Sequence, residues 1–329
     1  MNILNDAILQ RILSPADDPS NPHWSDALRR LASGDMTFTR KSAGEHSIAA
    51  IQRLLVFLGY STSSRGAFII DGDFGRGTNR AVAQFQFEHQ LNDSIYRKTL
   101  CYPCSFRNAH KRISTIPETR LTIATLQKMG EIALAKAKEN DVLCGDINEA
   151  IHQLNALHAR RLMTCNDINN HFGALLDEVI KETHITHQQT LQPEWVLAII
   201  KQETGGVVRP RFEQHKLSAY HQRNPTADFT ELRYRSMSQG LGQVMGEHFV
   251  RVGAASAKAM YVSPLKEQIR FVVNFLLTSN GLRSVVAKRH PKEADFRRLA
   301  RHYNGPSYET HHYHERIEHW YQEFIHIRM

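Results

Sequence analysis

At 329 residues, with 41% hydrophobic and 22% charged residues, the chain has the composition of a soluble globular protein and is long enough for two domains. No apolar run reaches the roughly 20 residues that a membrane span needs, and the N-terminal sequence lacks the basic start and apolar centre of a Sec-type signal peptide. The net charge of +8 favours a polyanionic partner, such as nucleic acid, anionic lipid or the acidic polymers of a bacterial envelope, without choosing among them.

Apolar residues at helical spacing dominate the chain from residue 46 onward, whereas the first 44 residues are mixed, with one short helical stretch near 24–32. A first strong helix begins at about residue 46, and a second opens after the glycine-punctuated turn at 71–75. The remaining predicted helices cover roughly 120–139, 145–162 with Asp146 as a cap, 167–183, 193–204, 264–280, 294–303 and 312–326. Strand signals are scarce, so the sequence predicts a mainly α protein.

The four cysteines do not define a site by their spacing. Cys101 and Cys104 form a C-x-x-C pair inside an insertion at about 92–116, and no second such pair accompanies Cys144 and Cys165. The spacing leaves open a redox pair, half of a zinc site, a disulfide among the four, and free thiols.

An ordered string of motifs spans residues 46–130. It consists of Ile51-Gln52, Asp71-Gly72-Asp73-Phe74-Gly75, Thr78 and Phe85-Gln86. This string resembles the peptidoglycan-binding domain family of the small three-helix type, which implies affinity for cell-wall glycopeptide and assigns Asp71, Gly72 and Phe74 to the wall-binding module. Glycine permits the turn, and Phe74 can cap a small core. A generic helical subdomain is the alternative, and the insertion before the third helix departs from the family pattern and leaves the binding groove undefined.

Glu203 lies at the end of an apolar helix that starts at Pro193. It follows Ile200, Ile199 and Val196 by three, four and seven residues, so its carboxyl shares their face. Burial and the negative end of the helix dipole are both expected to raise the pKa of this carboxyl, as a general acid requires. The alternative is a glutamate that simply ends a helix at the surface.

Two later segments follow Glu203 in order, "MSQGLGQVMG" at 237–246 and "RHYNGPSY" at 301–308. Together with "ETGG" they resemble the lysozyme-like superfamily of soluble lytic transglycosylases, goose-type lysozymes and phage-type N-acetylmuramidases. The resemblance implies that Glu203 is catalytic, and it covers about 190–329. The implied substrate-binding residues are Ser238, Gly240, Gln243, Tyr303 and Asn304. Turn formation is the alternative for the glycines, and core packing is the alternative for the tyrosine, which could otherwise orient Glu203 or stack on a sugar.

A second carboxylate follows in "RPRFEQHKL", which resembles the R-P-x-F-E-x-H segment of the N-acetylmuramidases. The resemblance implies that Glu213 is the partner of Glu203. Two carboxyls flanking a sugar bond suit hydrolysis, because one protonates the leaving oxygen and the other positions or activates water. A lytic transglycosylase needs only one, since the muramic 6-hydroxyl attacks internally. An ion pair of Glu213 with Arg209 or Arg211 is the alternative.

The C-terminal segment is rich in histidine, with residues 311, 312, 314 and 319 in "HHYHERIEH". His311 and His314 would share a face of a helix, but His314 and His319 are five residues apart and diverge by roughly 140° at 3.6 residues per turn. This geometry argues against a catalytic zinc, so we expect no metal and a solvated, partly basic face.

These patterns predict a mainly α enzyme: an N-terminal segment (1–44), a small three-helix peptidoglycan-binding domain (45–135), a helical connector (136–188) and a lysozyme-like α domain (189–329). The expected reaction is muramidase cleavage of the β-1,4 bond between N-acetylmuramic acid and N-acetylglucosamine, without a cofactor. Alternatives are a lytic transglycosylase that uses the same Glu203 and a catalytically silent wall-binding protein. Nucleic-acid binding has no recognition helix, RNA motif or zinc finger to support it.

The expected partner is bacterial peptidoglycan, with neither nucleic acid nor membrane insertion. A muramidase without a Sec-type signal fits a phage endolysin, or an antibacterial effector injected by a secretion machine and neutralised by an immunity protein. In both cases we expect synthesis in the cytoplasm and action in the periplasm or cell wall after non-Sec delivery.

Overall fold

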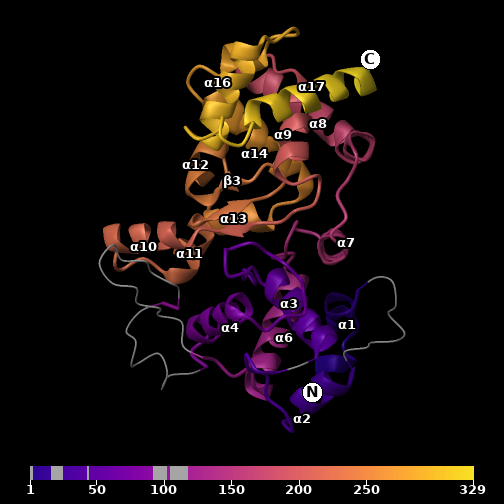
Figure 1. Cartoon of the computed structure of the whole chain (residues 1–329), viewed down its shortest axis with the longest axis vertical. Coiled ribbons are helices and arrows are strands. Elements are labelled where there is room, and N and C mark those ends of the chain that lie inside the picture. Colours follow the sequence, from indigo (N-terminus) through magenta and orange to yellow (C-terminus); the bar gives the residue numbers. More distant parts are fainter. Residues whose placement is uncertain (1–2, 16–24, 43, 92–101, 104–117) are drawn as a thin grey trace. The chain divides into compact units, whose positions relative to one another are not determined.

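The computed structural model describes residues 3–15, 25–42, 44–91, 102–103 and 118–329 (Figure 1). The prediction of a mainly α protein is confirmed, since the strands in the described residues are only two or three residues long. No helix in these ranges is both long and apolar enough to cross a membrane.

The chain divides into two compact units. Unit 1 comprises residues 1–160 and 209–238, and unit 2 comprises residues 161–208 and 239–329. This division differs from the predicted boundaries at one important place: residues 209–238, which the sequence placed in the C-terminal domain, fold with the N-terminal part of the chain.

The N-terminal part of unit 1 is helical. Its elements are η1 (Ile3–Asn5), α1 (Ala7–Leu13), α2 (Ser25–Ser33), α3 (Glu45–Phe57), α4 (Arg76–Glu88), α6 (Ile123–Lys138) and α7 (Ile147–Ala159). The predicted cap of α7 is confirmed, because the Asp146 carboxylate accepts from the N–H groups of Asn148 and Glu149. Helix α1 was not predicted, since a helix of seven residues offers too short a window for periodicity.

Helix α3 is the centre of unit 1, and even its polar residues Gln52 and Arg53 are fully buried. The Arg53 guanidinium donates from Nε to the carbonyl of Ile12 (2.7 Å) and from Nη2 to Oδ1 of Asn155 (2.7 Å). Burial lowers the pKa of Arg53 to about 9. These bonds tie the N-terminal helix and α7 to the helix of the predicted wall-binding module.

Residues 209–238 complete unit 1 with β1 (Arg211–Phe212), α10 (Gln214–Arg223), α11 (Phe229–Arg235) and the first part of β2 (Met237–Gln239). Strands β1 and β2 pair antiparallel, with Arg211 opposite Ser238 and Phe212 opposite Met237. The chain passes into unit 2 within β2.

Unit 2 is built around α9 (Pro193–Glu203), of which residues 195–200 have no exposed surface. Helix α9 packs against α8, α14 and α17 (Figure 1). The other elements are α8 (Cys165–His187), β3 (Val244–Met245), η2 (Gly246–His248), α12 (Phe249–Val252), α13 (Ala257–Val262), α14 (Leu265–Thr278), α15 (Arg283–Val286), α16 (Glu293–Asn304) and α17 (Tyr313–Arg328). At its core the Trp195 ring lies 4.6 Å from that of Tyr321 and 4.9 Å from that of Phe296.

The predicted cysteine pair, Cys101 and Cys104, lies outside the described residues. Cys144 and Cys165 are both buried, in unit 1 and unit 2 respectively. Burial, together with a hydrogen bond to Glu323, raises the pKa of the Cys165 thiol to about 12.

The histidine-rich segment differs from the expected solvated face. His311 and His312 are exposed, but His314 is only 4% exposed and packs edge-on against the ring of Tyr308. Because α17 begins at Tyr313, His311 is outside the helix, and the predicted helical face that it would share with His314 does not form.

Candidate active site

Glu203 is the last residue of α9. Residues 195–200 of this helix are buried, whereas Glu203 is half-buried. Its Oε1 accepts a hydrogen bond of 2.5 Å from the hydroxyl of Tyr313, the first residue of α17. The alternative of a glutamate that merely ends a surface helix does not fit, because the carboxyl is half-buried and held by a buried phenol. The expected rise of the Glu203 pKa stays a prediction.

Tyr313 is the residue that sequence reasoning missed. Its side chain is 3% exposed, and burial followed by the negative charge of Glu203 raises its pKa well above the usual value. The phenol therefore remains protonated at physiological pH and is the donor in its hydrogen bond to the carboxyl. No local sequence pattern predicts this contact, because the two residues are 110 positions apart. They meet because α17 packs along α9.

Tyr303, near the end of α16, lies in the same electrostatic environment. Burial and then the charge of Glu203 raise its pKa well above the usual value. Its hydroxyl donates to the carbonyl of Gly242 (2.5 Å), and its ring packs edge-on against Phe275 at 5.3 Å. The structure thus places this predicted site residue in a packing role as well as near the carboxyl of Glu203.

The predicted glycine-rich loop joins the same region of unit 2. Thr204, which follows Glu203, has its hydroxyl 2.9 Å from the carbonyl of Leu241. Gly240 and Gln243 both have positive φ, at +69° and +52°, and the Gln243 side-chain amide donates to the Gly240 carbonyl (3.0 Å). These contacts tie the loop backbone to the end of α9.

The close packing of this loop demands a glycine at position 242. A Cβ there would lie 2.3 Å from Cγ2 of Val272 and 2.9 Å from the hydroxyl of Tyr303. The predicted residue Asn304 ends α16 and is exposed. Unit 2 therefore brings together Glu203, Gly240, Gln243 and Tyr303 from distant parts of the sequence.

Glu213 lies in unit 1, as does Ser238, which pairs with Arg211 across β1 and β2. The Glu213 carboxylate forms an ion pair with Nε of Arg211 (2.9 Å), and its other oxygen lies 3.7 Å from Nδ1 of His215. The ion pair that the sequence offered as an alternative is thus present, with Arg211. The side chain retains 25% exposure, and its catalytic role stays a prediction.

Two parts of the chain match known families. Residues 177–325 match the family model described as N-acetylmuramidase, and residues 45–94 match that of a putative peptidoglycan-binding domain. This protein is a peptidoglycan muramidase. It carries a peptidoglycan-binding domain followed by a muramidase domain, as the sequence predicted.

Among solved structures, the muramidase is similar to a Burkholderia AP3 phage endolysin, with 16% identity and a TM-score of 0.35 over 89% of this chain and 99% of that one. No curated protein matches the muramidase.

The turn of the peptidoglycan-binding domain is organised by Gln52 of α3. Its Nε2 donates to Oδ1 of Asp71 (2.7 Å), and its Oε1 accepts from the N–H groups of Asp71 (2.9 Å) and Gly72 (2.8 Å). Gly72 has a φ of +74°, and Phe74 is 2% exposed, so both hold the muramidase's wall-binding turn in shape. Contact of these residues with the wall stays a prediction.

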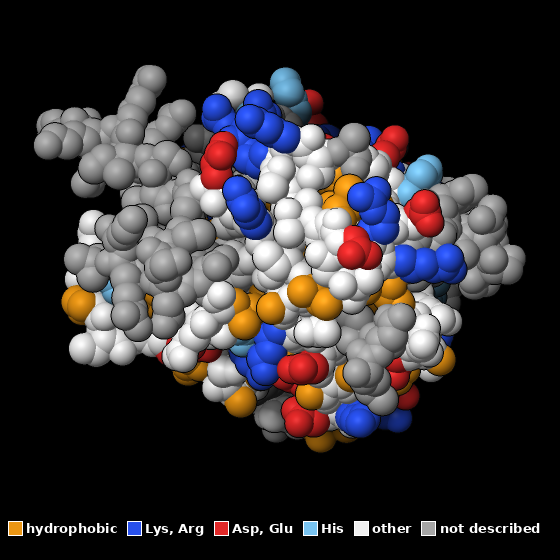
Figure 2. Space-filling model, turned by 90° about the horizontal axis from the view of Figure 1, so that it is seen from below, with side chains coloured by type: hydrophobic (Ala, Val, Ile, Leu, Met, Phe, Trp, Pro, Cys, Tyr) orange, Lys and Arg blue, Asp and Glu red, His pale blue; other side chains and the backbone are white. Residues whose placement is uncertain are grey.

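The positive charge of the muramidase is not gathered into one patch on the face that Figure 2 shows. There the Lys and Arg side chains of the described residues alternate with carboxylates and small apolar areas. This distribution gives no support to a nucleic-acid groove on that face.

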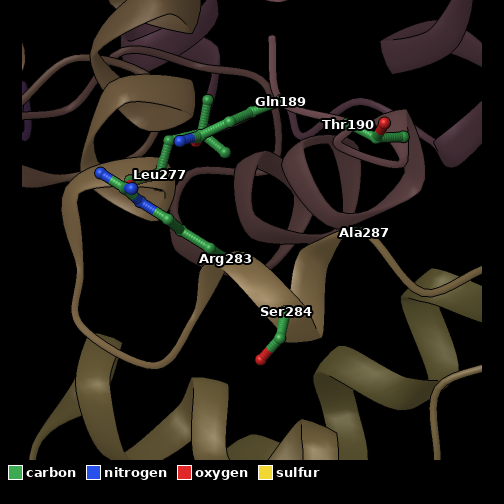
Figure 3. A pocket seen from close by; sticks show the side chains of 6 residues that line it. All are labelled: Gln189, Thr190, Leu277, Arg283, Ser284 and Ala287. Carbon is green, nitrogen blue, oxygen red and sulfur yellow. The ribbon is translucent and has the colours of Figure 1, made fainter. Parts of the chain in front are cut away.

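A pocket of about 310 Å³ lies in unit 2 beside α15, lined by Gln189, Thr190, Leu277, Arg283, Ser284 and Ala287 (Figure 3). Gln189 and Thr190 precede α9, whereas Glu203 ends it, so the pocket lies at the other end of that helix from the candidate acid.

Proposed function

We propose that Glu203 is the general acid of the muramidase and protonates the oxygen of the β-1,4 bond between N-acetylmuramic acid and N-acetylglucosamine. The observation that carries the proposal is the hydrogen bond from the buried Tyr313 hydroxyl to Oε1 of Glu203. In the structure Oε1 accepts from the phenol, so we assign the acidic proton to Oε2. Tyr313 thereby fixes which oxygen faces the substrate.

Bond cleavage then follows the usual course of glycoside hydrolysis. Proton transfer from Oε2 to the leaving oxygen accompanies an oxocarbenium-like transition state at the muramic acid carbon, which water attacks. We propose Glu213 as the carboxylate that positions or activates this water, supported by its place in the R-P-x-F-E-x-H segment. Its carboxylate forms an ion pair with Arg211.

The remaining predicted residues have supporting roles in this proposal. The backbone of the loop at Gly240 and the amide of Gln243 bind the glycan, with hydrogen bonds also from Ser238 and Asn304. Tyr303 anchors the loop through Gly242 and contributes its ring edge to the sugar site. In the peptidoglycan-binding domain, the turn of Asp71, Gly72 and Phe74 contributes to wall affinity.

The test is Glu203→Gln, which keeps the shape and the hydrogen bond from Tyr313 but removes the acidic proton. Clearing of suspended peptidoglycan should slow by about 100-fold or more, the usual contribution of a general acid. The matched control is Glu315→Gln, an exposed carboxylate on α17, which should clear at the wild-type rate. A wild-type rate for Glu203→Gln would refute the assignment and would favour a silent wall-binding role.

Two biological settings remain as proposals, a phage endolysin and an antibacterial effector with an immunity protein as partner. Only the effector setting includes an immunity protein that protects the producing cell. Expression directed to the periplasm should lyse bacteria in both settings, but co-expression of a neighbouring immunity gene should rescue growth only if the muramidase is an effector.

A further inference from the structure

Residues 209–238 belong in sequence to the muramidase family match, which covers 177–325, but they fold with the peptidoglycan-binding domain in unit 1. This segment carries Glu213, the proposed second carboxylate. The contacts that hold it therefore decide whether the wall-binding domain has a part in catalysis.

The first set of contacts consists of two main-chain contacts and one hydrogen bond from the side-chain amide of Gln214. The N–H of Phe212 donates to the carbonyl of Gly66 (2.8 Å), Arg211 forms a β-bridge with Ala67, and the Gln214 amide donates to the carbonyl of Ser64 (3.2 Å). Residues 211–214 are thus hydrogen-bonded along the 63–67 loop of the peptidoglycan-binding domain, and Glu213 lies within that stretch.

The approach of the two main chains at this point is too close for any side chain. A Cβ at Gly66 would lie 1.9 Å from the carbonyl oxygen of Phe212, and Gly66 also has a φ of +89°. On the other side, the N–H of Glu213 donates to the carbonyl of Ser236 (2.8 Å). The backbone around Glu213 is therefore fixed from both sides.

The second set of contacts is a buried ion pair. Arg233 of α11 and Glu88 of α4 have side chains that are 3% and 4% exposed, and the guanidinium donates to both carboxylate oxygens, at 2.8 Å and 3.1 Å. Hydroxyl groups of Tyr60, Tyr102 and Thr230 donate to the same carboxylate, and the carbonyl of Gly59 accepts from Arg233. These buried bonds fix α11 against α4, because any displacement of one helix would leave a buried charge without its partner.

A second residue of α4 also contacts this segment. Arg80 lies two helical turns before Glu88 and places its guanidinium 5.4 Å from the ring centroid of Phe212. Helix α4 of the wall-binding domain thus contacts the segment that carries Glu213 at both Phe212 and Arg233.

We propose that the peptidoglycan-binding domain is a positioning element for catalysis, with Gly66, Glu88 and Arg233 as positioning residues for the Glu213 segment. The domain then acts on the turnover number and not only on affinity for the wall. This inference depends on the proposed role of Glu213, and its test separates the two.

The test compares Gly66→Ala with Gly34→Ala. Both glycines have a φ of +89°, but a Cβ at Gly34 meets nothing within 4 Å, so the control carries the backbone strain without the clash. Turnover is measured on short soluble glycan strands at saturating concentration, where wall affinity does not enter kcat. We expect Gly66→Ala to lower kcat by about 10-fold to 100-fold, the usual cost of misplacing a catalytic group, with KM changed less than about twofold. The kcat of Gly34→Ala should stay within about twofold of wild type.

A second readout does not depend on activity. Hydrogen exchange of the Phe212 and Glu213 amides should accelerate in Gly66→Ala and not in Gly34→Ala, because the Phe212 amide donates to the Gly66 carbonyl and the Glu213 amide donates to Ser236 at the adjoining position. Should Gly66→Ala fail to fold, Arg233→Met replaces it, with Arg235→Met as control, since Arg235 pairs on the surface of the same helix, with Glu231. Arg233→Lys should recover part of the lost kcat.

Glu213→Gln in the same assay distinguishes the two hypotheses. If it turns over like wild type while Gly66→Ala is slow, the segment is positioned for another of its residues and only the role of Glu213 fails. A folded Gly66→Ala protein with wild-type kcat, or with unchanged exchange of the two amides, would overturn the positioning proposal.

Discussion

The hydroxyl of Tyr313 donates to Oε1 of Glu203 across 2.5 Å and so joins the first residue of α17 to the last residue of α9. This bond orients the carboxyl at the end of a helix whose residues 195–200 are all apolar and buried. Through this bond the C-terminal helix α17 contacts the proposed general acid, so the first prediction concerns Tyr313.

Tyr313→Phe should lower kcat by about 10-fold and the free energy of unfolding by about 1 kcal/mol, because it removes one hydrogen bond that orients the carboxyl. The measurements are turnover on soluble glycan strands and urea denaturation. Tyr308→Phe is the matched control, since it removes the hydroxyl of a buried tyrosine that donates to the surface residue Glu309 (2.8 Å). Equal losses in the two variants would show that the Tyr313 bond has no special role.

Gly242→Ala should destabilise unit 2 by about 1–3 kcal/mol, the usual cost of overpacking, because the added methyl group would overlap Val272 and the Tyr303 hydroxyl. Wall clearing should fall as well, since the loop would move away from the end of α9. Gly305→Ala provides the comparison for backbone strain without overpacking, because a Cβ there meets nothing within 4 Å but Gly305 has a φ of +83°. A melting temperature of Gly242→Ala equal to that of the wild type would contradict the packing argument.

The buried pair of Glu88 and Arg233 makes unit 1 sensitive to acid. Burial alone would raise the pKa of Glu88, but the charge and hydrogen bonds of Arg233 hold it below the usual value. A lowered pKa in the folded state stabilises the protein above the unfolded value of about 4.3, and this contribution is lost as the pH falls through the folded pKa. Urea denaturation at a series of pH values should therefore show an acid slope that depends on Glu88.

Glu88→Gln should remove that slope and cost about 3–5 kcal/mol at neutral pH, because it leaves Arg233 buried without a counter-charge. Glu131→Gln, which breaks the exposed pair with Lys128, should change the free energy of unfolding by less than about 0.5 kcal/mol. An unchanged acid slope in Glu88→Gln would mean that other carboxylates govern the acid transition.

Cys165 should resist alkylation at pH 8 in the folded protein, since a thiol with a pKa of about 12 has little thiolate at that pH. Peptide mapping after iodoacetamide treatment would measure this, with a urea-unfolded sample as the positive control. Rapid labelling of Cys165 in the native sample would indicate that the start of α8 opens readily.

Much of the helical framework was predictable, because the elements that bury a regular stripe carry local start and stop signals. Pro193 begins α9, Asp146 caps α7 and the 71–75 turn precedes α4, each as expected from the sequence. The short α1 and the polar helices α10 and α11 escaped prediction, since their windows hold too few apolar residues to define a period.

The arrangement of the site was only partly predictable. Motif resemblance placed Glu203, Gly240, Gln243 and Tyr303 in one region, and the structure brings them into one unit. The contacts that orient the Glu203 carboxyl and hold the Glu213 segment are long-range: Tyr313 lies 110 residues from Glu203, and Arg233 lies 145 residues from Glu88. Such pairings depend on tertiary packing, which no local pattern encodes.

The most direct test of the account is the chemistry of the products. Purified peptidoglycan would be digested in water enriched in ¹⁸O by the wild-type muramidase and by Glu203→Gln, and the released fragments analysed by mass spectrometry. The account predicts reducing N-acetylmuramic acid ends that carry one ¹⁸O from the wild type, and at most traces of product from Glu203→Gln. Ends of the 1,6-anhydro type from the wild type, or an undiminished yield from Glu203→Gln, would contradict it.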